Sequence, residues 1–403
     1  MPVVKEELGR RLKAARESAR MTQQQVATEL KLNRTAVTQL ESGDRAVSST
    51  ELAQLAYLYG RDMAEFFASE FSDKDALAAL FRAEPSMAER EDIAKTLRDC
   101  VAIAREQTNL EELLEIDRAW AVANYACTMP TRKGDAIRQG ERVAEEERQR
   151  LGLGTAPIEN LPELLESDGI RTRQISLAEE VSGFTMNDPK VGPFIVINAA
   201  HKAARKRYSL AHEYAHVLMD KQLLGVVSRQ SQHAELLEMR ANSFAANFLM
   251  PEKGVRQFLA SLGKERVTRT QAQIFDGESS VNVDVRSAPN RAIQLYDVVQ
   301  LASHFGVSRP AVLYRLLNLG IITSNEQTSL AQQNELAGRQ YARLMGVNED
   351  PQDMVHLDSN HRFVGLALEA LRREEISDGK FKQLARMVGI APDELEALAL
   401  QET

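Results

Sequence analysis

Cysteines, aromatic residues and long apolar runs are scarce in this chain of 403 residues. With two cysteines, Cys100 and Cys127, the chain cannot build a framework of several disulfides, which fits a reducing cytoplasm. No apolar run approaches the length of a membrane span, and the first residues lack the apolar centre of a signal peptide. We therefore expect a cytoplasmic protein that has no membrane partner.

A net positive charge is also lacking, because the formal charge at pH 7 is −8. A chain with this charge does not coat nucleic acid over its whole surface, so any contact with DNA must be local. Aromatic residues make up 5% of the chain and apolar residues 43%, which favours helices packed through leucine and alanine. The length predicts two to four domains.

The most specific pattern in the chain is His-Glu-x-x-His, formed by His212, Glu213 and His216. Residues four apart on a helix lie on the same face, so both imidazoles can reach one metal ion. This is the spacing of two zinc ligands in metalloproteases, in which the glutamate beside the metal acts as general base. The alternative is a pair of surface histidines on an amphipathic helix.

A second helix is predicted at 231–250, because apolar residues recur there at helical spacing and Pro251 ends the pattern. A carboxylate is the natural third ligand of a hydrolytic zinc site that keeps its fourth position for water. We predict that Glu238 fills this role, with Glu235 in reserve. The alternative is a solvated helix carboxylate at position 238.

The segment 198–251 resembles the ImmA/IrrE family of zinc metallopeptidases. The family pattern is an AHExxH helix followed by a helix of the form E..AN.FAA.LLMP, from which the chain departs only with Phe248 in place of leucine. The resemblance implies a zinc peptidase that cleaves a regulatory protein, typically a transcriptional repressor, in stress or mobile-element responses. One Zn²⁺ per chain is expected, and the same ligands also tolerate Mn²⁺.

In this interpretation Glu213 takes a proton from water and delivers it to the leaving amine. Tyr208 and Tyr214 are candidate donors to the oxyanion, although a tyrosine beside such a helix often serves packing alone. Apolar or alternating runs predict a strand at 192–198 and two further strands near 169–175 and 183–186. The last two are expected to belong to a small sheet. An extended peptide substrate can add to the edge of such a sheet.

Residues 1–70 predict a bundle of five short helices. Thr22 and Asn33 suit the N-caps of the second and third helices, and Gly43 suits the end of the third. Two short helices joined by a four-residue turn have helix-turn-helix geometry. Basic residues outnumber acidic ones by three between positions 1 and 45, which supplies a local charge for anchoring phosphates.

The stretch from Thr22 to Arg45 resembles the Cro/phage-repressor (XRE) type of helix-turn-helix, whose pattern is TQ..VA......R..V...E.G.R. The resemblance implies double-stranded operator DNA as a partner, bound by a homodimer. A helical protein-interaction module is the alternative. The candidate DNA-binding residues are Gln23, Arg34, Thr35, Thr38 and Gln39.

The rest of the chain is predicted to be largely helical. A cluster of basic residues before the His-Glu-x-x-His helix is interpreted as a solvated face or as a docking site for an acidic partner or DNA: Lys202, Arg205, Lys206 and Arg207. The expected segments are a connector at 71–130 that either pairs subunits or packs on the peptidase, the peptidase at 131–276 with a solvated helix at 136–150, a loop at 277–289 within a helix-turn-helix-like piece at 277–325, and a helical C-terminal region of unknown role at 326–403.

The predicted fold class is mainly α and multidomain. It combines a five-helix helix-turn-helix domain, an α+β zincin-like peptidase domain with a small sheet, and a helical C-terminal region. The predicted function is a DNA-binding transcriptional regulator with a zinc endopeptidase domain. The alternatives are an antitoxin-like regulator whose metal site is structural or sensory, and a zinc hydrolase of non-peptide substrates.

Overall fold

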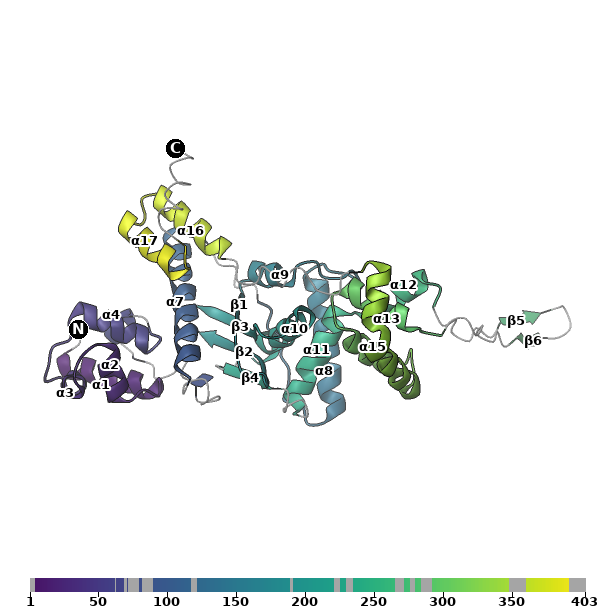
Figure 1. Ribbon diagram of the computed structural model, residues 1–403, viewed down its shortest axis with the longest axis horizontal. Coiled ribbons are helices and arrows are strands. Elements are labelled where there is room, and N and C mark those ends of the chain that lie inside the picture. Colours follow the sequence, from purple (N-terminus) through teal and green to yellow (C-terminus); the bar gives the residue numbers. More distant parts are fainter. Residues whose placement is uncertain are drawn as a thin grey trace.

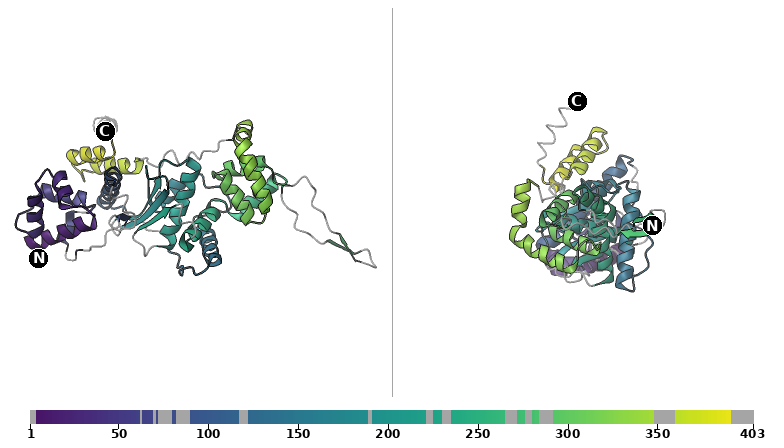
Figure 2. Two further views of the ribbon diagram at one scale, coloured as in Figure 1. Left: turned by 60° about the horizontal axis from the view of Figure 1, so that its bottom comes forward. Right: turned by 90° about the vertical axis from the view of Figure 1, so that its right-hand side faces the viewer.

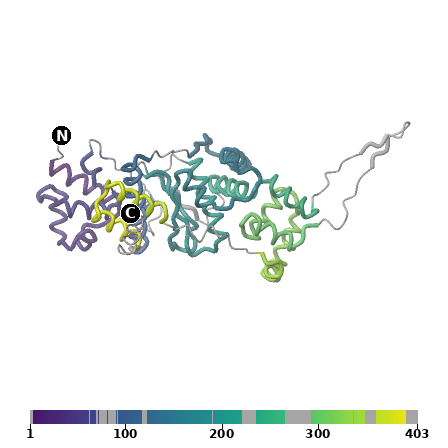
Figure 3. Tube along the Cα trace, turned by 90° about the horizontal axis from the view of Figure 1, so that it is seen from above, coloured from purple at the N-terminus to yellow at the C-terminus, as the bar shows by residue number. Residues whose placement is uncertain are grey.

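The structure is a computed structural model, and it describes residues 4–61, 63–68, 71, 80–81, 90–116, 122–188, 191–220, 225–229, 235–264, 272–275, 280–283, 292–347 and 360–390. The parts of the chain lie in a row (Figure 1): an N-terminal bundle, one upright helix, a small sheet and a group of helices. The left view of Figure 2 and the trace seen from above (Figure 3) show the same elongated order. The predicted fold class, mainly α with one small sheet, is confirmed.

The N-terminal bundle is built around a core of aliphatic side chains that includes Leu12, Val26, Val37 and Leu55. Its elements are α1 (Lys5–Ser18), α2 (Gln23–Glu29), α3 (Arg34–Ser42), α4 (Ser49–Leu58) and the 3-10 helix η1 (Met63–Phe67).

The ends of α2 and α3 follow the predicted capping residues. The Thr22 side chain accepts a hydrogen bond from the backbone N–H of Gln25, and the Asn33 side chain accepts one from Ala36 at 2.7 Å. Gly43 ends α3 with φ 82°, a conformation that glycine adopts without steric cost. Thr22 thus begins α2, Asn33 ends the turn between the two helices and Gly43 ends α3, as predicted.

The helix α7 (Glu91–Leu113) stands between the bundle and the sheet (Figure 1). Its first half packs Ile93, Leu97 and Val101 against one face of the sheet. Its last turn joins a different cluster, in which Leu110 and Leu114 meet residues of the C-terminal helices. Within the predicted connector, α7 therefore packs on the peptidase region, and subunit pairing stays a prediction.

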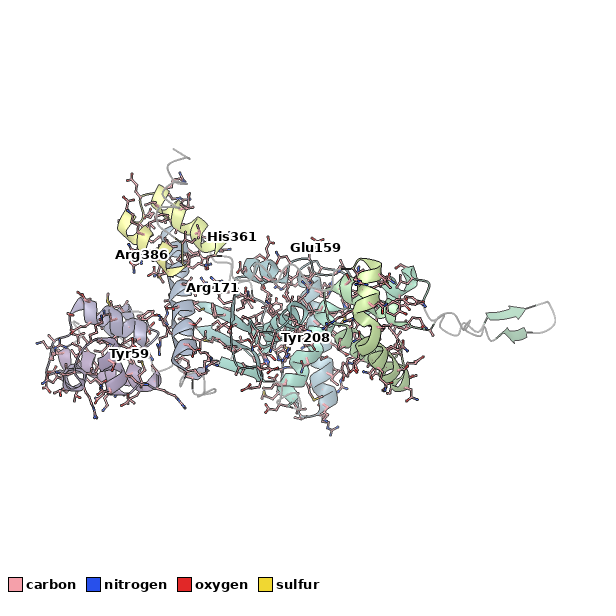
Figure 4. The ribbon with its side chains drawn as sticks, in the orientation of Figure 1. Tyr59, Glu159, Arg171, Tyr208, His361 and Arg386 are labelled. Carbon is pink, nitrogen blue, oxygen red and sulfur yellow. The ribbon has the colours of Figure 1, made fainter. Side chains whose placement is uncertain are left out.

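Polar contacts reinforce the position of α7. The Tyr57 hydroxyl of α4 donates a hydrogen bond to Asp99. Near the other end Glu111 is buried between Arg171, at 3.2 Å, and Arg362, at 3.1 Å. Figure 4 labels Arg171 at the junction of α7 and the sheet. One helix thus touches the bundle, the sheet and the C-terminal helices.

The sheet has four strands in the order β1-β3-β2-β4. The strands are β1 (Arg171–Ile175), β2 (Val181–Asp188), β3 (Gly192–Asn198) and β4 (Gly225–Arg229), of which only the pair β1–β3 is parallel. The central strand β3 is buried along its whole length. Phe194 and Val196 face α7, while Ile195 and Ile197 face the opposite cluster, which contains Leu210 and Phe244. The pleat of a strand requires this alternation.

Four helices lie on the second face of the sheet: α8 (Lys133–Arg150), α9 (Leu161–Ser167), α10 (Ala203–Met219) and α11 (Leu236–Leu249). The expectation of a solvated helix at 136–150 is wrong for one side of α8. Its buried side packs on α11 so closely that a Cβ at Gly140 would lie 2.4 Å from the Arg240 carbonyl oxygen. The sequence did not indicate this buried side because α8 is rich in charged residues.

The remaining elements are α12 (Glu252–Ser261), β5 (Ala272–Phe275), β6 (Ser280–Val283), α13 (Leu295–Phe305), α14 (Arg309–Asn318), α15 (Ser324–Met345), α16 (His361–Arg372) and α17 (Asp378–Met387). The expected loop at 277–289 contains the strand β6, which pairs antiparallel with β5; its other residues lie outside the described part. The helices α13, α14 and α15 share one core with α10 and α11. None of the described helices is long and apolar enough to cross a membrane.

Candidate metal centre

The helix α10 carries His212, Glu213 and His216 at the centre of the molecule. Both histidines lie on the same side of the helix, with ring centroids 5.1 Å apart, as expected for positions four apart. The helix packs against the sheet on one side and against α11 on another, and every residue from Ser209 to Met219 is buried. The motif is therefore fixed by packing rather than exposed on a surface.

Glu238 of α11 faces the two histidines. Its carboxylate oxygens lie 3.1 Å from His212 Nε2 and 3.4 Å from His216 Nε2. In the described residues these three side chains form a group whose ligand atoms all lie within 4.8 Å of one another. The reserve candidate Glu235 is exposed at the N-cap of α11 and is not part of this group.

The cluster fits a tetrahedral divalent ion. Ligand bonds of about 2.0–2.2 Å to such an ion place neighbouring ligand atoms about 3.4 Å apart, close to the two measured separations. The Nε2 atoms of His212 and His216 are buried and have no hydrogen-bond partner of acceptable geometry in the structure. Two imidazoles and one carboxylate form the ligand set of a zinc site with an open position.

Hydrogen bonds to Nδ1 orient both rings. His212 Nδ1 lies 3.1 Å from the Asn242 Oδ1 atom, and His216 Nδ1 lies 2.8 Å from the Asp220 Oδ2 atom. With Nδ1–H donating to these oxygens, each Nε2 keeps its lone pair for a metal, as in other sites where a second partner fixes the histidine tautomer. Asp220 is held in turn by the buried guanidinium of Arg240.

Asp220 and Arg240 were not identified from the sequence. One signal was present, since Asp220 follows His216 by four residues and lies at the end of the same helix. Arg240 offered no such signal, because an arginine two residues after Glu238 predicts a solvated side chain, whereas it is 1% exposed. Its role depends on the approach of α11 to α10.

Burial opposes charge on the cluster, but the contacts inside it outweigh burial. Burial raises the pKa of Glu238, while His212 and His216 lower it to about 2. Burial lowers the pKa of His216, while Asp220 and Glu238 raise it to about 10. Without metal the cluster is therefore held together as an ion pair, and metal binding must displace the proton from His216.

Glu213 points from α10 towards the strand β2. The Thr185 hydroxyl donates a hydrogen bond to its Oε2 atom at 2.7 Å, and the carboxylate is fully buried. Gly183 makes room for this carboxylate, because a Cβ there would lie 3.2 Å from Glu213 Oε1 and 2.7 Å from the Val196 carbonyl oxygen. Sequence patterns did not single out Thr185 or Gly183, whose importance depends on the register between β2 and α10.

The two candidate oxyanion donors differ in position. Tyr214 lies two residues from His212 and thus faces another side of α10; it is fully buried and its hydroxyl donates to Glu147 of α8. This correction assigns Tyr214 to packing between α10 and α8. Tyr208, labelled in Figure 4, lies one turn before His212 and donates to the Asn242 carbonyl oxygen at 3.0 Å. Its oxyanion role stays a prediction.

The candidate DNA-binding residues lie on α2 and α3. The side chains of Arg34, Thr35, Thr38 and Gln39 are exposed. Gln23 is half-buried: its Nε2 donates to Glu41 at 2.9 Å, and its Oε1 accepts from the Thr38 hydroxyl at 3.3 Å. The structure thus joins Gln23 and Thr38 across the two helices, and their contacts with DNA stay predictions.

A helix-turn-helix bundle, followed by a sheet-backed helix that carries two histidines and a glutamate, defines a protein with a DNA-binding domain and a metallopeptidase-like domain. Comparison with known families agrees. Residues 165–317 match the peptidase M78 family model, described as the IrrE N-terminal-like domain, and residues 7–66 match a helix-turn-helix domain model. The search of curated proteins found no match.

These matches confirm the predicted resemblance and the predicted order of the two domains. The first matched range contains the sheet, α10, α11 and all three residues of the His/Glu cluster; the second contains α2 to α4 and all but the first two residues of α1. The chain therefore combines an N-terminal helix-turn-helix DNA-binding domain with an IrrE-like domain of the peptidase M78 type. The predicted domain boundaries stay predictions.

Proposed function

We propose that this protein is a cytoplasmic transcriptional regulator that is also a zinc-dependent endopeptidase. The observation that carries the proposal is the meeting of His212, His216 and Glu238, with Glu213 one residue from the first ligand. The substrate in this proposal is a repressor or another regulatory protein, cleaved in a stress, mobile-element or defence response. One Zn²⁺ per chain is the proposed cofactor, and Mn²⁺ can replace it.

In this function a bound zinc ion supplies a Lewis acid that polarises the scissile carbonyl and lowers the pKa of water. Glu213 accepts the proton of the attacking water and returns it to the amine that leaves. Thr185 holds the Glu213 carboxylate in one orientation through its hydrogen bond. Asn242 and Asp220 hold the two imidazoles so that Nε2 faces the ion.

The helix-turn-helix domain gives the peptidase its location in this proposal. The helix α3 would enter the major groove of operator DNA with Arg34, Thr35, Thr38 and Gln39 exposed on it, and Gln23 would contribute from α2. A homodimer would bind a palindromic operator. Because the helix-turn-helix domain and the peptidase domain belong to one chain, DNA binding would raise the local concentration of the peptidase at one promoter.

The test is incubation of the wild-type protein with the products of neighbouring genes, followed by mass spectrometry for new peptide termini. Cleavage is expected with the wild type and must fall by at least about 10²–10⁴-fold with Glu213→Gln, which keeps the three metal ligands. The matched control is Glu235→Gln, which changes an exposed glutamate outside the cluster. Equal cleavage by the Glu213→Gln variant would overturn the proposal.

A second function follows from the burial of the site. His212, Glu213, His216 and Glu238 are each at most 5% exposed, as is common for closed, structural metal sites. A regulator with a structural or sensory metal would need no general base. If the Glu213→Gln variant binds metal and regulates its promoter as the wild type does, this second function replaces the first.

A further inference from the structure

A large cleft lies beside the metal cluster, between α10 and α11 on one side and α14 and α15 on the other. Its volume is about 1750 Å³, above the range of about 300–1,000 Å³ that is typical of small-molecule sites. Two of its lining residues connect it to the cluster: Asn242 contacts His212, and Tyr208 lies one turn before His212 on α10.

The lining of the cleft is strongly basic within an acidic protein. Five cationic side chains face a single acidic one, Glu141, among the described residues of the lining. The five are Lys202, Arg205, Arg309, Arg315 and Arg339. The chain as a whole carries a formal charge of −8, so the cleft concentrates positive charge where the overall balance opposes it.

Four of these cations divide into two kinds. Arg315 is buried and committed to the structure, because it donates to the Met250 carbonyl oxygen and to the Asn247 side chain. Lys202 and Arg339 are exposed and Arg205 is half-buried. In the part of the chain that the structure describes, no carboxylate lies within ion-pair distance of these last three residues.

The remaining walls are not those of a simple anion site. Met239 and Ala246 of α11 contribute apolar surface, and Tyr314 of α14 lies in the lining with 61% of its surface exposed. Exposed tyrosine and methionine suit the side chains of a polypeptide. Two helices, α10 and α14, also begin at the cleft with Ala203 and Arg309, and the positive ends of helix dipoles favour anions.

We propose that this cleft docks an acidic segment of the protein substrate beside the metal centre, with Lys202, Arg205 and Arg339 as the main charge contacts. This inference rests on the proposed peptidase function and adds the chemical class of the substrate. The positive charge and the size of the cleft favour an acidic polypeptide. The apolar surface of Met239 and Ala246 argues against duplex DNA, whose phosphates need an open basic surface. The DNA-reading bundle lies at the opposite end of the molecule (Figure 1).

Of the basic residues grouped in the sequence, the structure keeps two in this surface. Lys202 and Arg205 line the cleft. Lys206 donates to Gln174 at 2.9 Å, and Arg207 is 2% exposed and donates to the Ile158 carbonyl oxygen. The docking surface is therefore formed from separate parts of the chain, with Arg339 supplied by α15, which lies outside the matched family range.

The first experiment measures binding without any need for cleavage. A labelled short peptide rich in glutamate, and its counterpart with glutamine in every glutamate position, are titrated with the full-length chain by fluorescence anisotropy. The glutamate peptide is expected to bind, and the double variant Arg205→Glu/Arg339→Glu to weaken it at least about tenfold. The matched control is Arg138→Glu/Lys253→Glu, at positions whose side chains are 72% and 80% exposed outside the cleft.

The possible results distinguish an acidic-peptide site in the cleft from a nucleic-acid site and from the absence of a specific site. Equal binding of both peptides, no binding of the glutamate peptide, or equal affinity of the two double variants would overturn the proposal. Loss of random-sequence duplex DNA binding in the cleft variant, with peptide binding unchanged, would assign the cleft to nucleic acid instead. Thermal unfolding at an unchanged midpoint shows that the double variant is folded.

A second measurement separates this inference from the proposed peptidase. Once a cleaved protein is identified, the cleft variant is expected to raise KM at unchanged kcat, whereas Glu213→Gln removes kcat and leaves peptide binding intact. Peptide binding without any cleavage would defeat the peptidase and keep the cleft as a docking surface. Cleavage with a KM that the cleft variant does not change would defeat the docking role and keep the peptidase.

Discussion

The metal cluster and the DNA-reading face differ in what holds their side chains. At the cluster, each histidine has a hydrogen-bond partner at Nδ1, and Asp220 is itself held by Arg240. On α3, Arg34, Thr35 and Gln39 extend into solvent, whereas Thr38 is held by Gln23 of α2 and caps fix the helix ends. The first site is preorganised, whereas the exposed side chains of α3 would have to be ordered by any DNA that they contact.

This comparison predicts unequal responses to substitution. A change inside the cluster should alter metal binding steeply, because the buried neighbours cannot rearrange. A change on α3 should alter only the contacts of the replaced side chain.

The largest effect is expected from Glu238→Ala. Loss of the carboxylate leaves two imidazoles, which are too few ligands for a stable zinc site. Metal content, measured by mass spectrometry of the dialysed protein, should fall from about one ion per chain to nearly none. Arg34→Ala serves as the control and should keep its metal; zinc retained by Glu238→Ala would show that another group is the third ligand.

Glu147→Gln tests the buried side of α10. Burial raises the pKa of Glu147, but hydrogen bonds from Arg150, Tyr214 and Tyr125 outweigh it and lower the pKa below its usual value. A lowered folded-state pKa stabilises the protein above the unfolded value of about 4.3, and this stabilisation is lost as the pH falls through the folded pKa.

The variant should therefore lower the unfolding free energy at pH 7 by about 3–5 kcal/mol. It should also flatten the decline in stability below about pH 4.3, measured by denaturant unfolding at several pH values. The exposed Glu145, at 80% side-chain exposure, gives the control Glu145→Gln. A parallel pH profile of Glu147→Gln and wild type would contradict the prediction.

Asp220→Asn should weaken metal binding without abolishing it. The variant keeps an oxygen for His216 Nδ1 but loses the charge that supports the ring, and such changes cost about 10–100-fold in metal affinity. Competition with a chromogenic zinc chelator measures this change. An unchanged affinity would mean that Asp220 serves only to hold Arg240.

Arg34→Ala should give the most local change, confined to the affinity for DNA. A side chain that contacts a base edge or phosphate on its own contributes about 1–3 kcal/mol to binding. Affinity for the operator, once identified by selection from random duplexes, should fall by about 5–150-fold at fixed salt, as this energy implies. Arg256→Ala, far from α3 on α12, is the control, and a metal content altered by Arg34→Ala would break the comparison between the two regions.

The features that the sequence predicted depend on local geometry. The spacing of His212 and His216 places them on one face of any helix, and Thr22, Asn33 and Gly43 act within a few residues of their own positions. The features that it did not predict depend on contacts between distant segments. Thr185 reaches Glu213 across 28 positions, and Gly140 meets Arg240 only because α8 and α11 pack together.

The fold followed the same division. The helix α11 was predicted at 231–250 and spans Leu236–Leu249, and α10 was predicted as a helix around His212 and His216. The hairpin of β5 and β6 was not predicted: β6 lies in the segment 277–289, whose glycine, serine and asparagine content predicts a loop, and no strand was predicted at β5. The buried side of α8 was also missed, since it is formed by a glycine, two alanines and a valine, together with buried Glu147 and Arg148, in a helix rich in charged residues.

The position of α7 has a consequence for synthesis of the chain. The second ion pair of Glu111 cannot form until Arg362, 251 residues later in the chain, has been synthesised. At the usual rate of about 5–20 residues per second, Leu110 and Leu114 therefore spend roughly 10–50 s on the ribosome before their neighbours on α16 have been made. The hydrophobic cluster at the end of α7 is therefore completed only when the last described part of the chain, α16 and α17, has been made.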